Sequence, residues 1–266
     1  PNSPVVAKIM AKQRPQGHWE EAGSPYLPKY KASYWQIMIL SELGMDKGDE
    51  RVRRACEYIF GFQHDEGGFS CISLEQARAR YESATMKAKS NIPYRDEWAS
   101  AYVREQQLSC LTGNISAALI RMGYGDDARV GKALRWLSRI QNRDGGWLCP
   151  YWSAHARDTH GCFGGTIGAL DPFSQMPRGK LTGEMRRVAG AGAEFLLMHR
   201  LYKADHHNYR IINRNWLKLG FPPFYGGGIL RSLDIMTKLG YVDDERLSDA
   251  VRVLLSKRRK DGTWVL

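Results

Sequence analysis

Cysteine and histidine side chains gather in the middle of this chain, in a spacing typical of a metal site. His155, Asp158, His160 and Cys162 lie within eight residues, and Cys162 matches Cys110 in the register of an internal repeat. Thiolates and imidazoles are the ligands that zinc prefers in proteins. Both cysteines lie where a helix is predicted to begin, so we expect them to converge at one end of the fold.

The sequence therefore predicts a bound Zn²⁺, with ligands contributed by several segments. Cys149 follows the aromatic of one repeat copy by two residues, as Cys71 does in another copy. Three thiolates and one imidazole would make a closed, structural site, and an open position would make it catalytic. Two other interpretations stay open: a metal-free Cys/His site, or thiols that only fill the core. The predicted ligands are Cys110, Cys149, His160 and Cys162, with Cys71, His155 and Asp158 as alternates.

The same segment also offers acid–base chemistry. An aspartate beside a histidine orients an imidazole as a general base, which makes His155, Asp158, His160 and Cys162 the catalytic candidates. The adjacent pair His206-His207 is expected in an exposed loop, where it would be suited to contact a phosphate.

These residues belong to a repeated pattern that fixes where they lie. Gln, three residues, Gly, one residue and an aromatic recur four times, the last time with Arg for Gln. An amphipathic helix is predicted before each copy after the first, and a more apolar helix precedes it, at about 34–43, 112–122, 164–170 and 229–239. Aspartates are expected to cap the amphipathic helices, as in Asp49-Glu50, Asp126-Asp127 and Asp243-Asp244. The copies are Gln13–Gly17–Trp19, Gln63–Gly67–Phe69, Gln141–Gly145–Trp147 and Arg258–Gly262–Trp264.

Helix pairs that repeat must stack into a solenoid or close into a ring, so the predicted fold is all-α. We expect one domain over residues 1–266. An irregular insertion at about 73–108 should contain at least one helix, near 74–87, and a long loop is expected over 171–183. The count of four to five pairs makes a homodimer one way to complete a ring.

Composition excludes several classes of protein. Hydrophobic residues make up 43% of the 266 residues, and no apolar run approaches the roughly 20 residues that span a bilayer. Five cysteines without a secreted framework favour reduced thiols and a cytoplasmic location. The net charge of +11 attracts anions such as nucleic acid, an anionic lipid surface or a phosphorylated small molecule, or it serves solubility alone. Its lysines and arginines are dispersed, so nothing points clearly to nucleic acid.

The Gln–Gly–aromatic copies between Gln13 and Trp264 resemble the QW motifs of the terpenoid cyclase and protein prenyltransferase superfamily. This resemblance implies an α/α toroid, in which inner helices surround a cavity and outer helices enclose them. The Asp-x-Asp-Asp acid of triterpene cyclases is absent from the sequence. His160-Gly161-Cys162 resembles the zinc-binding Asp-Gly-Cys of prenyltransferases, with His in place of Asp. The chain is most similar to small prokaryotic members of uncharacterised reaction.

The resemblance implies a terpene cyclase-like or prenyltransferase-like enzyme that acts on an isoprenoid or prenyl diphosphate in the cavity. Aromatic faces suit such a chain or a carbocation, and Arg231 or Lys218 would meet a diphosphate. The alternative is a non-catalytic helical-repeat module that binds a partner and holds structural zinc or buried thiols. The predicted substrate-binding residues are Tyr34, Trp35, Trp152, Phe163, Tyr225 and Arg231.

Overall fold

The computed structural model describes residues 3–89, 91–92, 94–151, 155–224 and 228–265 of the chain. Within these residues the helices are joined by loops and turns, and the strands form one short antiparallel pair, β1 (Lys203–Ala204) with β2 (Arg210–Ile211). The all-α fold class is therefore confirmed. In the described part, no helix is long and apolar enough to cross a membrane.

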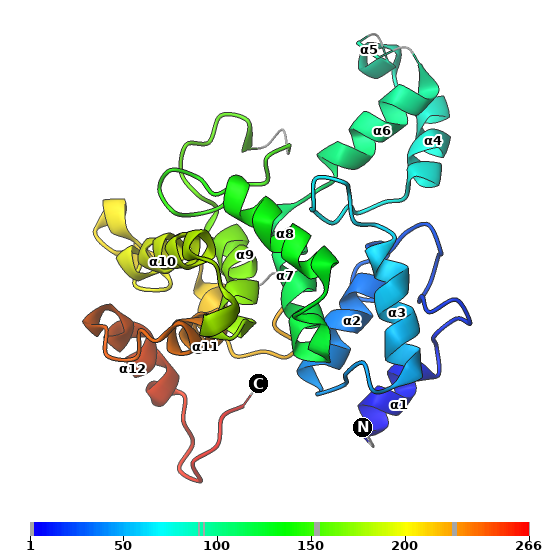
Figure 1. The fold of residues 1–266 in the computed structure, drawn as a ribbon. Helices are drawn as coiled ribbons and strands as arrows, with labels where there is room; N and C mark the ends of the chain where they lie inside the picture. The colour runs from blue at the N-terminus through cyan, green and yellow to red at the C-terminus, as the bar shows by residue number, and fades with distance from the viewer. Residues whose placement is uncertain (1–2, 90, 93, 152–154, 225–227, 266) are drawn as a thin grey trace.

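Inner and outer helices alternate along the chain as the repeat predicts. Each inner helix packs against the next, α2 against α7, α7 against α9 and α9 against α11, so that the pairs follow a curve (Figure 1). This is the inner and outer arrangement of an α/α toroid. The pairs are α2 (Ser33–Glu42) with α3 (Glu50–Phe60), α7 (Ser109–Leu119) with α8 (Ala128–Arg139), α9 (Phe163–Gln175) with α10 (Gly183–Met198), and α11 (Ile229–Leu239) with α12 (Ser248–Ser256).

The inner helices α7 and α9 approach so closely that only glycine fits between them. A Cβ on Gly113 would lie 2.1 Å from the carbonyl oxygen of Gly168. Pro172, four residues further on, has no N–H to bond that carbonyl, yet α9 continues to Gln175. The loop predicted over 171–183 therefore begins too early, because α9 continues past Pro172 to Gln175.

The repeated glutamines connect one outer helix to the next. The Nε2 atoms of Gln63 and Gln141 each donate to the carbonyl of the glycine four residues later, and to Arg129 O and Val188 O on the following outer helix, at 2.8 Å. Gln13 does the same toward Arg51 O at 2.9 Å. Asp49 and Asp127 cap α3 and α8 as predicted, whereas Asp244 caps the 3₁₀ turn that directly precedes α12.

A hydroxyl on each of three inner helices accepts a hydrogen bond from the backbone N–H of the preceding repeat aromatic. The acceptors are Ser33 for Trp19, Thr112 for Phe69 and Thr166 for Trp147, at 2.9–3.0 Å. These bonds align Thr112 with Thr166, which places Cys162 opposite Leu108 rather than Cys110. The predicted register of the two cysteines is therefore wrong by two residues, about half a helical turn.

The insertion at 73–108 is mostly helical. Helices α4 (Leu74–Ser83) and α6 (Arg95–Glu105) pack together, with the short α5 (Met86–Lys89) between them, and this hairpin projects away from the helix pairs (Figure 1). The helix predicted near 74–87 is confirmed as α4. The remaining short elements are α1 (Pro4–Met10), the π-turn η1 (Ile120–Tyr124), and the 3₁₀ turns η3 (Arg178–Lys180), η4 (Asp205–His207), η5 (Arg214–Leu217) and η6 (Glu245–Leu247).

Candidate functional site

A cavity of about 580 Å³ lies where the inner helices α2 and α11 and the turn η1 meet the segment 215–224. Its volume is that of a site for a small organic ligand. Cations and apolar side chains share its wall. The cationic and acidic lining residues are Glu42, Arg121, Lys218, Arg231, Asp234 and Lys238, and the larger apolar ones are Tyr30, Leu219, Phe221, Pro222, Pro223, Phe224 and Leu230.

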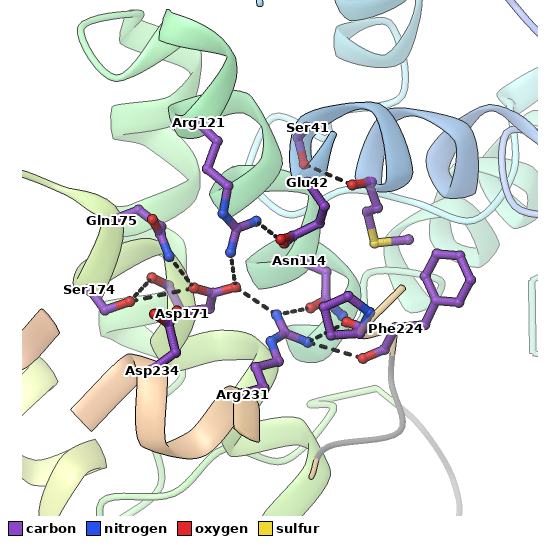
Figure 2. Close-up of polar contacts among 12 residues, drawn as sticks. Ser41, Glu42, Asn114, Arg121, Asp171, Ser174, Gln175, Phe224, Arg231 and Asp234 are labelled. Atoms are coloured by element: carbon purple, nitrogen blue, oxygen red, sulfur yellow. Dashed lines mark hydrogen bonds and ion pairs between the residues drawn. The ribbon is translucent and has the colours of Figure 1, made fainter. Parts of the chain in front are cut away.

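A buried carboxylate organises the cationic side of this cavity. Asp171 Oδ2 receives Arg121 Nη2 at 2.8 Å and Arg231 Nη2 at 2.7 Å, so one carboxylate joins side chains from η1, α9 and α11 (Figure 2). Glu42, at the end of α2, pairs with the other side of Arg121 at 3.0 Å. Burial alone would raise the pKa of Asp171, but Arg231 and Arg121 hold it well below its usual range. Asp171 is therefore a fixed anion and not a proton donor at neutral pH.

Two donors of this network lack a hydrogen-bond partner among the described residues. Arg231 directs its two Nη atoms to Asp171, Asn114 and the carbonyls of Pro223 and Phe224, but its buried Nε has no acceptor. Buried Asn114 Nδ2 is also unpaired. Unsatisfied buried donors mark places where a water or a ligand atom is expected.

Two of the six predicted substrate-binding residues lie outside the described part of the chain, Trp152 and Tyr225. Arg231 lines the cavity. Tyr34 is fully buried and donates its hydroxyl to Ser70 O, so it serves the core. Trp35 is also buried, but it packs edge-to-face on Phe224 of the cavity wall, with ring centroids 4.9 Å apart.

Phe163 lies elsewhere, at the start of α9. Its ring stacks on Trp216, with centroids 4.6 Å apart, and also contacts His199. Tyr34 and Phe163 are therefore not brought to the cavity by this fold.

The predicted zinc ligands do not come together as a set. In the described chain, no three of Cys110, Cys149, His160 and Cys162 bring their ligand atoms within 4.8 Å of one another. Cys162 caps α9 through Gly165 N, at 3.4 Å, and still lies near enough to Cys110 for its charge to raise the pKa of that thiol. The three cysteines are therefore neighbours without the close approach of metal ligands, and zinc binding by them stays a prediction.

Cys110 and Cys149 do form a close thiol pair. The hydrogen bond from Cys110 lowers the pKa of Cys149 to about 6, against the effect of burial, and Ser109 Oγ lies 3.5 Å from its Sγ. The same bond and burial raise the pKa of Cys110.

The predicted acid–base group is divided between two places. His155 Nδ1 accepts from the backbone N of Cys149, at 3.1 Å, and so lies beside the thiol pair. His160 instead contacts the rings of Phe195 and His199 near α10. Asp158 is exposed. The loop that carries these residues turns between them, which their spacing in sequence did not reveal.

The sequence reasoning missed the Asp171 network. One signal was available, since a single aspartate between Leu170 and Phe173 of an apolar helix implies a buried partner. Its partners Arg121 and Arg231 are 50 and 60 residues away in sequence, so they could not be identified from spacing.

This arrangement of inner and outer helices is shared with type II terpene cyclases. A crystal structure of a protein from Actinoplanes superposes with a TM-score of 0.53 and 16% identity, over 98% of this chain and 66% of that one. Two variants of the type II terpene cyclase MstE from Scytonema, in complex with geranylgeranyl dihydroxybenzoate, give TM-scores of 0.52 and 0.51 at 16% and 17% identity.

The comparison with MstE covers 98% of this chain and 62–64% of the cyclase, so the chain spans slightly less than two thirds of the length of MstE. The toroid fold that the resemblance implied is thereby confirmed. No protein-family profile matches the chain, and neither does any curated protein sequence.

Proposed function

We propose that this protein is a terpene cyclase-like or prenyltransferase-like enzyme that takes an isoprenoid or prenyl diphosphate into the cavity between α2, η1 and α11. One observation carries the proposal: cations and exposed apolar side chains face the same space of about 580 Å³. An anionic head joined to a hydrocarbon chain matches both parts of that wall.

The polar part of the wall is suited to a phosphate. Four cations face it, Arg121, Lys218, Arg231 and Lys238, and three of them already bind carboxylates. Lys218 is exposed and has no carboxylate within ion-pair distance in the described chain, so its charge is available to a ligand. Arg231 adds the unpaired Nε described above. Guanidinium and ammonium groups held in this way bind phosphate oxygens by charge-assisted hydrogen bonds.

The apolar part of the wall is unusually exposed for large side chains. Tyr30, Phe221 and Leu230 are 59%, 48% and 43% exposed, and all three line the cavity. Apolar surface gathered in one concave place favours a hydrophobic ligand. The substrate in the MstE structures carries a geranylgeranyl chain, which supports an isoprenoid over other hydrophobic ligands.

The chemistry of the wall favours reactions that begin at a diphosphate over reactions that begin with protonation of a double bond. Asp171, the buried carboxylate of the inner helices, is held as an anion by two arginines, so it lacks the proton that cyclisation by protonation requires. Its role is to position Arg121 and Arg231. Departure of a diphosphate needs positive charge where negative charge develops, which these cations supply.

The test is binding of geranylgeranyl diphosphate and of geranylgeraniol to the purified protein, measured by calorimetry, followed by product analysis. We expect the diphosphate to bind at least tenfold more tightly than the alcohol, and Lys218→Ala to remove that difference because a charge-assisted bond contributes about 1.5–3 kcal/mol. Lys257→Ala is the matched control, since Lys257 is exposed in the basic run of residues 257–260, away from the cavity.

Other results would decide against parts of the proposal. Equal loss in both lysine variants would mean non-specific attraction by the net charge, and no binding of either compound would overturn the proposal. Tight binding without any product would favour the alternative, a non-catalytic binding module. Zinc dependence, a homodimer and a cytoplasmic location are further proposals that this experiment does not address.

A further inference from the structure

A second group of polar side chains lies away from the cavity, between the start of α9 and the end of α10. His160, Asp205 and His206 bring one ligand atom each within 4.8 Å of one another. His160 directly precedes the segment that enters α9, while Asp205 and His206 belong to η4, which the β1–β2 pair holds in place. Two distant segments thus supply two imidazoles and a carboxylate to one point.

The hydrogen bond of His160 leaves its Nε2 atom available to bind a metal ion. Its Nδ1 lies 3.0 Å from Gly161 O, and a carbonyl only accepts, so Nδ1 carries the hydrogen. In the neutral ring the lone pair is therefore on Nε2. A backbone carbonyl on the second nitrogen is the arrangement that orients metal-binding histidines.

A buried histidine behind the group gives independent support. His199 is 3% exposed and its Nδ1 donates to Phe195 O, at 2.7 Å, so its neutral Nε2 also carries a lone pair. That Nε2 faces Asp205 Oδ1 at 3.4 Å, and the other oxygen of Asp205 faces His206 Nε2 at 3.3 Å. A lone pair on His199 Nε2 that faces Asp205 is repelled by the carboxylate unless a proton or a metal cation lies between them.

From this geometry we infer a binding site for a divalent transition metal of the zinc class, with His160, Asp205 and His206 as ligands and His199 beside them. Imidazole nitrogen with one carboxylate suits Zn²⁺ and its first-row neighbours better than Ca²⁺ or Mg²⁺. The exposure of His160 and His206 leaves a coordination position to solvent. Bound metal would tie the entrance of α9 to the turn after α10, and the inference does not depend on the proposed substrate.

The experiment is titration of the chelator-treated full chain with ZnCl₂ in a calorimeter, with bound metal counted by elemental analysis. We expect one ion per chain. His206→Ala should weaken binding by at least about 100-fold, because loss of a partner that only orients a ligand already costs 10–100-fold. His207→Ala is the matched control, since His207 is the next residue of the same exposed turn and lies outside the group. It should bind as the parent does.

Cobalt substitution identifies the ligand type. Co²⁺ held by His160, Asp205 and His206 gives visible d–d bands without a thiolate-to-metal charge-transfer band. A charge-transfer band that Cys149→Ser abolishes would assign the ion to the cysteines and overturn the inference. Unchanged affinity in His206→Ala, or no zinc binding by the parent protein, would overturn it as well.

Discussion

The third and fourth copies of the Gln–Gly–aromatic repeat make the same local bond in very different surroundings. The indole N–H of Trp147 donates to Leu137 O, and that of Trp264 donates to Leu254 O, both at 2.8 Å and ten residues back. Trp147 is nevertheless fully buried, while Trp264 is 37% exposed. The aromatic therefore packs against its own helix through a local hydrogen bond, whereas its burial comes from the next repeat.

Contacts that point forward along the chain account for this difference. Gln141 bonds Val188 O on α10, and Gly145 lies so close to α10 that a Cβ would be 2.4 Å from Ala191 O. In the fourth copy Arg258 bonds Gly262 O within its own turn. No described helix follows α12. A repeat of this kind is thus stabilised largely by its successor, as expected for stacked units.

The inner helices α9 and α11 also differ in how far their aspartates are buried, and the largest effect is expected there. Asp171 on α9 is 1% exposed and joins two arginines, whereas Asp234 on α11 is 49% exposed and pairs with Lys238 one turn away. We expect Asp171→Asn to lower the free energy of unfolding by about 3–5 kcal/mol, because it leaves two cations without their buried anion. Asp234→Asn, the matched control, should cost about 0–1 kcal/mol. Urea unfolding at neutral pH measures both.

A fall in pH should also show the contribution of Asp171 to stability. Because the folded pKa of Asp171 is depressed, its contribution is complete above the ordinary aspartate pKa and is lost as the pH falls toward the folded value. The parent protein should therefore lose stability below about pH 4 more steeply than Asp171→Asn. Parallel pH curves for the two proteins would contradict the assignment of Asp171 as the shared anion.

The glutamine of the repeat gives the next largest effect. Gln141→Ala removes two hydrogen bonds, to Gly145 O and Val188 O, each with a net contribution of about 0.5–1.5 kcal/mol. A loss of about 1–3 kcal/mol is expected in thermal or urea unfolding. Arg258→Ala in the fourth copy should stay within about 0.5 kcal/mol, as is usual for exposed sites. Equal losses would mean that the motif stabilises its own turn and not the next helix.

These contrasts also explain how much the sequence could predict. Helix pairs, caps and repeat turns depend on residues close in sequence, such as Asp127 as the cap of α8 or Gly123 with its φ of 93° after α7. Periodicity and turn chemistry therefore sufficed for the helix pairs, and the resemblance to a known superfamily supplied the toroid. The resemblance implied that Lys218 or Arg231 would meet a diphosphate, and both line the cavity.

The rest of the candidate site depends on the angles at which helices and loops present side chains. Cys110 and Cys162 were aligned by residue identity, but the hydroxyls of Thr112 and Thr166 set the true register. His160 lies two residues from Cys162 and still contacts Phe195 of α10, because the chain bends at His160. The direction in which a side chain points, and ion pairs between distant residues such as Asp171 and Arg231, can be seen only in the folded structure.

The smallest effect is expected for the contacts that each outer helix makes with the outer helix before it. In the pair α7–α8, Asp127 caps α8 and binds Arg129, which reaches Glu57 on α3. In the pair α11–α12, Asp244 binds Arg246, which reaches Glu194 on α10. The two glutamates are similarly exposed, 57% and 53%.

Glu57→Gln and Glu194→Gln should therefore cost the same small amount, about 0.2–1 kcal/mol each at low salt, and less at high salt because exposed pairs are screened. Urea unfolding at two ionic strengths measures this. Binding to Arg129 lowers the pKa of Glu57 in the folded chain, so its contribution should persist above the ordinary glutamate pKa and fade as the pH falls below it. If Glu194→Gln cost nothing while Glu57→Gln cost stability, the fourth repeat would be loosely attached on its backward side too, and burial of the repeat aromatic would not depend on the following helix alone.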